Sequence, residues 1–285
     1  MNSQANFVLT LSCGDRKGIV AAVANCIASQ GCNICESAQY GDPETLRFFM
    51  RVSFAAPEGM TREQFVEGFR PVATAYDFDW EVHDLSRKPR VLIMVSKMGH
   101  CLNDLLYRNG TGQLRMDLVG VASNHETWRS RVEHEKLPFH YLPVTKDTKK
   151  EQEAQILELV EREKIDLVIL ARYMQILSDD LSQALAGKVI NIHHSFLPSF
   201  IGARPYHRAH ARGVKMVGAT AHYVTADLDE GPIIEQDVSR VEHAHTVEEL
   251  IAQGRDTESQ VLARAVKYHL DHRILLNGDR TVIFK

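Results

Sequence analysis

The first part of the chain switches between the two hydrophobic periods that distinguish strands from helices. Apolar residues alternate with polar ones over 46–54, as in a half-buried strand, whereas Ile19, Val23 and Ile27 recur at helical spacing. The predicted elements, in order, are a strand at 7–11, a helix at 19–31, a hairpin of strands at 32–40 and 46–54, a helix capped by Thr61 and Gln64, and a strand at 78–82. This βαββαβ order is the ferredoxin-like arrangement.

After a charged stretch at 87–90, short apolar strands alternate with helices. The predicted strands lie at 91–95, 118–122, 167–171, 189–192, 218–224 and 233–238, and the predicted helices at 102–107, 127–135, 151–163, 179–186 and 246–270. This alternation is typical of an α/β fold with a doubly wound, mostly parallel, Rossmann-like sheet. Asn277-Gly278 predicts a final hairpin over 273–284. We therefore expect one domain at 1–86, a linker at 87–90 and a second domain at 91–285.

Charge and composition narrow the classes of partner. The 285 residues carry a formal net charge of −4 and no dense Lys/Arg cluster, so we expect no nucleic-acid partner. No apolar run reaches the roughly 18 residues of a membrane span and no signal peptide is recognisable, so we expect a cytoplasmic protein with no membrane partner. The five cysteines are odd in number and mostly lie in apolar segments, which favours reduced, buried thiols.

Candidate chemistry gathers at the end of the predicted strand 189–192. Asn191 and His193 lie two residues apart and share one face of that strand, at the carboxyl edge where open α/β sheets bind ligands. Asp229 follows Asn191 by 38 positions. An amide, an imidazole and a carboxylate of this kind can converge on one carbonyl, which points to acyl chemistry.

Several other histidines follow His193 in the sequence, but their spacing does not predict a metal site. No HExxH or comparable pair stands on a predicted helix, so we expect no metal. We expect surface or supporting roles for His194, His207, His210, His243 and His245.

The second domain resembles the formyltransferases that use 10-formyltetrahydrofolate. The motifs that carry the likeness are Asn191-x-His193, Leu197-Pro198, Gly202, and His222 followed by Asp229-x-Gly231-Pro-Ile-Ile-x-Gln236. The resemblance implies that Asn191, His193 and Asp229 are catalytic and that His222 supports Asp229. It further implies that the folate is bound by Met174, Gln175, Ile176 and Leu177 on one side and by Thr225, Ala226, Asp227 and Leu228 on the other.

The catalytic roles can be argued from the chemistry of each group. As a nucleophile adds to a formyl group, its oxygen gains negative charge, which an amide donor and an imidazolium stabilise. Asn191 and His193 supply such groups. Asp229 can hold His193 protonated, and it can also orient or deprotonate the attacking species.

The turn after the first strand resembles the ACT family of small regulatory domains. The likeness rests on Asp15-x-x-Gly18-Ile-Val between a strand and a helix. ACT domains commonly bind amino acids at this turn, in pairs across a subunit interface, so the resemblance implies a homo-oligomer with Asp15 and Gly18 as effector contacts. A turn that only starts a helix, in a module that only dimerises, is the other interpretation.

The acceptor of the formyl group is indicated by the segment 96–101. Glycinamide ribonucleotide transformylases grip their acceptor's phosphate with a loop of small residues here, whereas this chain has Lys97, Met98, His100 and Cys101 around Gly99. The basic C-terminal domain of methionyl-tRNA formyltransferases is not expected either. Both acceptors are disfavoured, and water is the remaining common nucleophile.

An ACT-like module ahead of a formyltransferase fold resembles the formyltetrahydrofolate deformylases. That likeness implies hydrolysis of 10-formyltetrahydrofolate to tetrahydrofolate and formate, feeding one-carbon and purine metabolism, with the folate as substrate and no tightly bound cofactor. Two alternatives stay open: formyl transfer to an unphosphorylated acceptor, and a non-enzymatic sensor of amino acids and folate.

Overall fold

The structure is a computed structural model that describes residues 6–198 and 205–285. Gly202, one of the motif residues, lies outside the described residues. The chain divides into two compact units, of which the first is Met1–Lys88 with Asp271–Lys285 and the second is Pro89–Leu270.

The first unit has the predicted βαββαβ order. Its elements are β1 (Phe7–Gly14), α1 (Ile19–Ser29), β2 (Asn33–Asp42), β3 (Arg47–Ala55), α2 (Arg62–Tyr76) and β4 (Asp79–Asp84). The sheet is antiparallel with the order β2-β3-β1-β4, which confirms the ferredoxin-like arrangement. Phe65 and Phe69 of α2 pack with Leu9 and Phe54 of the sheet in one core. The predicted capping box of Thr61 and Gln64 opens α2.

The C-terminal hairpin belongs to the first unit, whereas the sequence placed it in the second domain. Its strands are β12 (Ile274–Asn277) and β13 (Arg280–Ile283). Phe49 packs with Leu275 and Phe284, while the Arg51 guanidinium donates to the carbonyls of Asp271 and His272, each at 3.0 Å. The physical reason is that β3 is buried on both faces: Phe48, Met50 and Val52 meet the helices, and the alternate residues meet the hairpin.

The second unit is the predicted doubly wound domain. Its elements are β5 (Arg90–Val95), α3 (His100–Gly110), β6 (Asp117–Ser123), a 3-10 turn (Glu126–Trp128), α4 (Arg129–His134), β7 (Phe139–Tyr141), α5 (Lys149–Arg162), β8 (Leu167–Leu170), α6 (Asp179–Ala184), β9 (Val189–His193), α7 (Pro205–Arg212), β10 (Met216–Tyr223), β11 (Ile233–Arg240) and α8 (Val247–Leu270). The sheet order is β11-β10-β9-β8-β5-β6-β7, parallel from β9 to β7, with β10 and β11 antiparallel. The predicted fold class is therefore confirmed.

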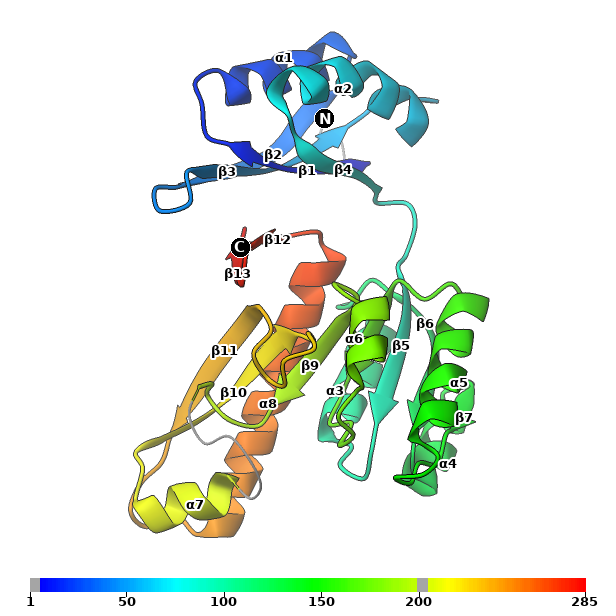
Figure 1. Cartoon of the computed structure of the whole chain (residues 1–285), viewed down its shortest axis with the longest axis vertical. Coiled ribbons are helices and arrows are strands. Elements are labelled where there is room, and N and C mark those ends of the chain that lie inside the picture. The colour runs from blue at the N-terminus through cyan, green and yellow to red at the C-terminus, as the bar shows by residue number, and fades with distance from the viewer. Residues whose placement is uncertain (1–5, 199–204) are drawn as a thin grey trace. The chain divides into compact units, whose positions relative to one another are not determined.

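The strand order sets the place of the ligand crevice. From β5 the chain first adds β6 on one side and later returns to add β8 on the other, so the order reverses between β5 and β8. Helices lie on both sides of this sheet (Figure 1), and α5 and α6 share a core with β5 and β8. The loops that follow β5 and β8 part at this reversal and leave room for a ligand.

None of the five cysteines forms a disulfide. Cys13, Cys26, Cys32 and Cys101 are buried as expected, but Cys35 is exposed. Cys35 lies within β2, where the extended backbone separates it from Cys32.

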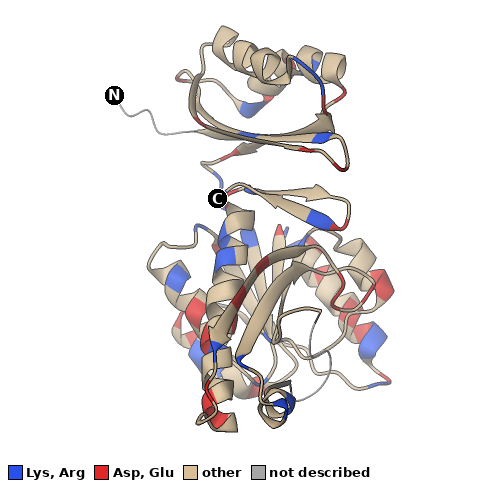
Figure 2. Cartoon of the chain, turned by 90° about the vertical axis from the view of Figure 1, so that its left-hand side faces the viewer, with Lys and Arg blue, Asp and Glu red and all other residues tan. Residues whose placement is uncertain are grey.

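Charged residues of both signs are interspersed along the helices (Figure 2), as the sequence indicated. Among the helices of the described residues, none has the length and apolarity that a bilayer crossing requires.

The hairpin generates a stability prediction. Leu275→Ala removes a buried side chain from the contact with Phe49, and we expect the first unit to lose about 2–5 kcal/mol of unfolding free energy. Urea unfolding followed by Trp80 fluorescence, in a Trp128→Phe background, measures this loss because Trp80 is then the only tryptophan. The matched control is Leu276→Ala, since Leu276 is 52% exposed, and it should cost no more than about 0.5 kcal/mol. Equal effects of the two variants would contradict the assignment of the hairpin to this unit.

Candidate active site

A cavity of about 670 Å³ opens in the second unit, within the size range of small-molecule sites. The segment after β8, the end of β9 and the loop between β10 and β11 all contribute to its wall. The cavity is lined by every residue that the sequence named as catalytic, supporting or folate-binding: Asn191, His193, His222, Asp229, Met174, Gln175, Ile176, Leu177, Thr225, Ala226, Asp227 and Leu228.

Strand pairing brings the polar groups together. Strand β10 runs antiparallel to β9, with His222 opposite Asn191 and Thr220 opposite His193. Directly opposed residues in such a pair have neighbouring side chains on the same face. The loop after β10 returns Asp229 to the same place, in a left-handed backbone conformation with φ 59° that aspartate tolerates better than most residues.

His193 is oriented by Asp229. The Nδ1 atom of His193 lies 3.2 Å from Oδ2 of Asp229, so Nδ1–H donates to the carboxylate. The other ring nitrogen, Nε2, is buried and has no hydrogen-bond partner among the described residues. Because His193 lines the cavity, Nε2 is the atom that it can offer to a substrate.

His222 fixes the orientation of the Asn191 amide. Its Nδ1 lies 2.8 Å from the carbonyl oxygen of Tyr223, which can only accept, so Nδ1 carries the proton. In the neutral ring Nε2 is then an acceptor, and it lies 3.2 Å from Nδ2 of Asn191. One N–H of the amide is thus held by His222, and the second remains for a group in the cavity.

Asp229 carries a stabilised negative charge. Burial by itself raises the pKa of this carboxyl, but the hydrogen bond from His193 outweighs burial and holds the pKa well below its usual value. The second oxygen, Oδ1, lies 3.6 Å from Nε2 of His222. Asp229 therefore stays ionised at neutral pH, beside the one histidine nitrogen that it can keep protonated.

Large apolar side chains are exposed at the predicted folate-binding segments. Met174, Ile176 and Leu228 are 56%, 61% and 56% exposed, and all three line the cavity. Apolar surface gathered around a concave site is typical of a pocket for a flat ring system.

The segment that follows His193 is held by the neighbouring strands. Thr220 Oγ1 donates to the carbonyl of Ser195 at 2.9 Å and accepts from the N–H of Leu197 at 3.0 Å. Gln236, the last residue of the sequence motif, donates from Nε2 to Thr220 Oγ1 and to the carbonyl of Leu197. These bonds fix the segment after β9 and hence the end of the strand that carries His193.

Several polar residues line the cavity although the sequence assigned them no site role or, for His194 and His207, predicted only a surface or supporting role. Arg172, His194, Tyr206, His207, Arg255 and Glu258 all contribute to its wall. Burial, together with the charges of Arg172 and His193, lowers the pKa of His194 to about 4, so this ring is neutral at pH 7. One signal in the sequence indicated that Glu258 is buried. It lies on the same face of its helix as Gly254, Val261 and Leu262, which are all buried.

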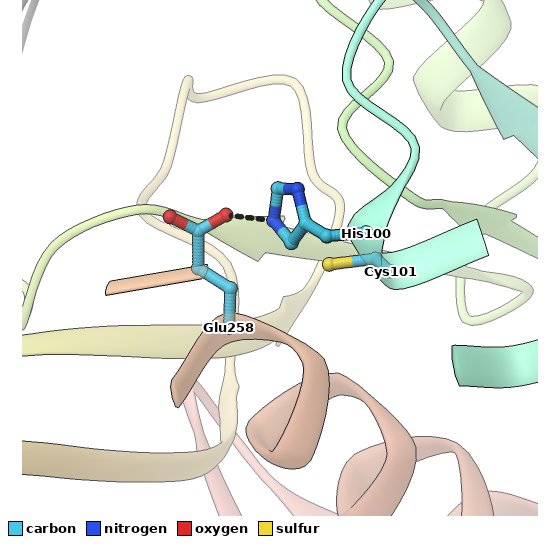
Figure 3. A group of neighbouring side chains, drawn as sticks. All are labelled: His100, Cys101 and Glu258. Carbon is cyan, nitrogen blue, oxygen red and sulfur yellow. Dashed lines mark hydrogen bonds and ion pairs between the residues drawn. The ribbon is translucent and has the colours of Figure 1, made fainter. Parts of the chain in front are cut away.

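Glu258 is the centre of a buried polar cluster. Its carboxylate is 1% exposed and accepts from His100 Nε2 and from Tyr206 Oη, each at 2.7 Å. Arg172 Nε lies 3.4 Å from the same carboxylate. Figure 3 shows Glu258 reaching from α8 toward His100 and Cys101 at the start of α3.

The groups His100, Cys101 and Glu258 are of the types that bind metals, and their ligand atoms lie within 4.8 Å of one another. The surroundings of these groups favour a hydrogen bond between them over a bound metal ion. The His100–Glu258 distance of 2.7 Å is that of a hydrogen bond, and the Arg172 guanidinium already balances the carboxylate. Burial raises the pKa of the Cys101 thiol, which keeps the sulfur protonated and a poor ligand.

The loop after β5 is filled by protein side chains. Trp128 packs on Gly99 so closely that a Cβ at residue 99 would overlap the indole, and Trp128 Nε1 donates to the carbonyl of Lys97 at 3.2 Å. The loop is therefore not an open cradle for a phosphate, as the sequence indicated for residues 96–101.

The two residues named as effector contacts lie in the first unit, and neither lines the cavity. Gly18 precedes α1 with φ 92°, a left-handed conformation that suits glycine, and Tyr76 Oη would lie 3.2 Å from a Cβ there. The Asp15 carboxylate is exposed and borders Gly41. The Tyr76 hydroxyl thus lies close to Gly18, while the Asp15 carboxylate is open to solvent.

Comparisons with known proteins agree with this geometry. The formyl transferase family matches residues 89–266. A formyltetrahydrofolate deformylase of Corynebacterium sp. (strain P-1) is 50% identical over 290 residues, covering 100% of both chains. The crystal structure of a formyltetrahydrofolate deformylase from Pseudomonas syringae pv. tomato str. DC3000 matches with a TM-score of 0.97 at 45% identity, covering 100% of this chain and 96% of that one.

A narrower likeness extends to the transformylases. The structure of glycinamide ribonucleotide transformylase 1 from Symbiobacterium toebii matches with a TM-score of 0.64 at 27% identity, covering 70% of this chain and 95% of the other. Likeness to the deformylases spans the whole sequence at far higher identity. The chain therefore belongs to the formyltetrahydrofolate deformylase family of hydrolases.

Proposed function

We propose that Asn191, His193 and Asp229 hydrolyse 10-formyltetrahydrofolate to tetrahydrofolate and formate in the cavity of the second unit. The observation that carries the proposal is the buried, unpartnered Nε2 of His193, within the described residues, beside an amide whose second N–H is uncommitted. Two such donors suit the oxyanion that forms when water adds to a formyl group. Family membership favours hydrolysis over the transfer and sensor alternatives.

The reaction balances without a further reactant. Water adds to the formyl carbon, and the carbonyl oxygen becomes an oxyanion that accepts from Asn191 and from protonated His193. Collapse of this intermediate breaks the carbon–nitrogen bond. The folate nitrogen takes up one proton of the water, and formate leaves. The second proton of the water passes to solvent. The depressed pKa of Asp229 makes it a weak base, so it serves mainly to hold the imidazolium and to orient the water.

The folate is proposed to lie between the two walls predicted from the sequence. Residues 174–177 follow β8, and residues 225–228 lie between β10 and β11, with their exposed apolar side chains facing the cavity. The folate is a substrate, and the proposal includes no resident cofactor or metal.

Asn191→Ala tests the oxyanion role. Loss of one preorganised donor should lower kcat by on the order of 10²–10³-fold, or about 2.7–4 kcal/mol, with a smaller change in KM. Formate release from 10-formyltetrahydrofolate with no added acceptor gives the rates. The control is Gln183→Ala, which removes an exposed amide from α6 and should leave both constants unchanged. A kcat within about threefold of the wild type would remove Asn191 from the oxyanion site.

Asp229→Asn tests the electrostatics through the pH dependence of stability. The folded-state pKa of Asp229 is depressed, so its contribution is fully present above the unfolded pKa of about 3.9 and is lost as the pH falls through that value toward the folded pKa. We expect the variant to be less stable than the wild type at pH 6 and the gap to narrow below about pH 4. Urea unfolding from pH 6 to 3 measures the gap. The exposed Asp227→Asn is the control; a gap for Asp229→Asn that is constant across this range would contradict the assignment.

We further propose that the turn containing Asp15 and Gly18 binds an amino acid of one-carbon metabolism and regulates the hydrolase. The exposed Asp15 carboxylate suits the ammonium group of such a ligand. ACT-like pairing makes a homo-oligomer part of the proposal, and five cysteines that form no disulfide suit the reducing cytoplasm.

Isothermal titration with glycine and with methionine tests the effector site. We expect heat with at least one of them, a parallel change in formate release, and loss of both responses in Asp15→Ala. Asp79→Ala removes another exposed carboxylate of the same unit and should respond like the wild type. The absence of heat and of any change in rate with both amino acids would remove the proposal.

A further inference from the structure

The groups already assigned to the reaction include no efficient acceptor for the proton of the attacking water. Burial would raise the pKa of Asp229, but the hydrogen bond from His193 outweighs it and leaves this carboxylate a weak base. The two ring nitrogens of His222 are both engaged in hydrogen bonds. The carboxylate of Glu258 accepts a hydrogen bond at each of its oxygens. A further group of the cavity has to take this proton.

His194 lines the cavity with an imidazole that is not engaged in this way. The residue lies at a bend directly after β9, so its side chain does not turn to the opposite face as it would in a continued strand. Its ring lies beside that of His193, with centroids 5.0 Å apart and planes at 28°, and both rings line the cavity. The ring of Tyr206 is further away, at 6.5 Å between centroids. Within the described residues, no hydrogen bond engages either ring nitrogen of His194.

The charges around His194 keep its ring neutral at pH 7. Burial, together with the charges of Arg172 and His193, lowers the pKa of His194 to about 4, although Glu258 and Asp229 act in the opposite direction. A neutral imidazole has one nitrogen that donates a hydrogen bond and one that accepts. His194 can therefore accept a hydrogen bond from a water molecule in the cavity.

We propose that His194 is a catalytic residue of the hydrolysis, which takes a proton from the attacking water and returns it to the folate nitrogen. As the carbon–oxygen bond forms, one O–H bond of the water breaks, and its proton passes to the free ring nitrogen of His194. As the carbon–nitrogen bond breaks, this proton moves to the folate nitrogen. The second proton of the water passes to solvent when formate leaves, so the ring ends neutral, as it began.

The two neighbouring imidazoles thus have different roles because their partners differ. His193 is bonded to the Asp229 carboxylate, which keeps it protonated and suits it to stabilise the oxyanion. His194 has no carboxylate bonded to its ring among the described residues, so it stays neutral and suits proton transfer. Negative charge that develops on the formyl oxygen favours protonation of a ring nearby, so the basicity of His194 rises as water adds. This inference deepens the proposed function and rests on it for the identity of the reaction.

His194→Ala tests the proton transfer. We expect kcat for formate release to fall by roughly 10²–10⁴-fold, with KM for 10-formyltetrahydrofolate within about threefold of the wild type. Added imidazole should then raise the rate of the variant by about tenfold or more, because it replaces the missing base. Thiazole is a ring of the same size but a much weaker base, so it should restore far less activity. A ring that merely fills space would be replaced equally well by either compound.

A control and a second variant complete the test. His210→Ala removes an exposed imidazole from α7 and should leave kcat and KM unchanged, with no response to imidazole. If His194→Ala fails to fold, His194→Gln, which keeps a polar side chain that is not a base, carries the same expectation for kcat and KM. A folded variant with kcat within about threefold of the wild type, or a loss that imidazole restores no better than thiazole, would overturn the inference. A wild type that releases no formate would overturn the proposed function instead.

Discussion

The site depends on one hydrogen bond, from His193 Nδ1 to the Asp229 carboxylate. This bond directs the Nδ1 proton of His193 toward the carboxylate and therefore leaves Nε2 toward the cavity. It also compensates the partly buried negative charge that the loop between β10 and β11 carries at Asp229. The fold supplies the two ends of this bond separately, His193 from the end of a parallel strand and Asp229 from an antiparallel extension of the same sheet.

Two buried carboxylates in one cavity have different surroundings and hence different consequences. Asp229 faces two histidines beside the reacting position, whereas Glu258 is enclosed by a guanidinium, a phenol and an imidazole at the start of α3. Burial raises the pKa of both, and hydrogen-bond donors lower it again in both. The difference is therefore one of position: Asp229 holds an imidazole that lines the cavity, and Glu258 balances the charge of Arg172 near the start of α3.

The sequence could predict what is local in the chain. Strand ends, the capping boxes and the order of elements follow from patterns that repeat within a few residues. Asn191, His193 and the 174–177 segment could be placed because each lies at or just after the end of a predicted buried strand. Strand β7 and helix α7 were missed because three and eight residues carry too short a pattern. The C-terminal hairpin was assigned to the wrong unit because it packs on the second face of β3. The alternation of residues along one strand shows that a face is buried, but it does not show which segment covers that face.

Glu258 shows a different limit of sequence reasoning. Its burial is visible in the helical pattern, but its meaning depends on His100, which lies 158 residues earlier, and on Arg172. Only the sheet order, which places the ends of β5 and β8 side by side, brings those residues to one carboxylate. Catalytic groups on neighbouring strand ends can be read as a motif because the sheet fixes their spacing. Glu258 comes from a helix packed over that edge, and its convergence with His100 and Arg172 is a property of the fold alone.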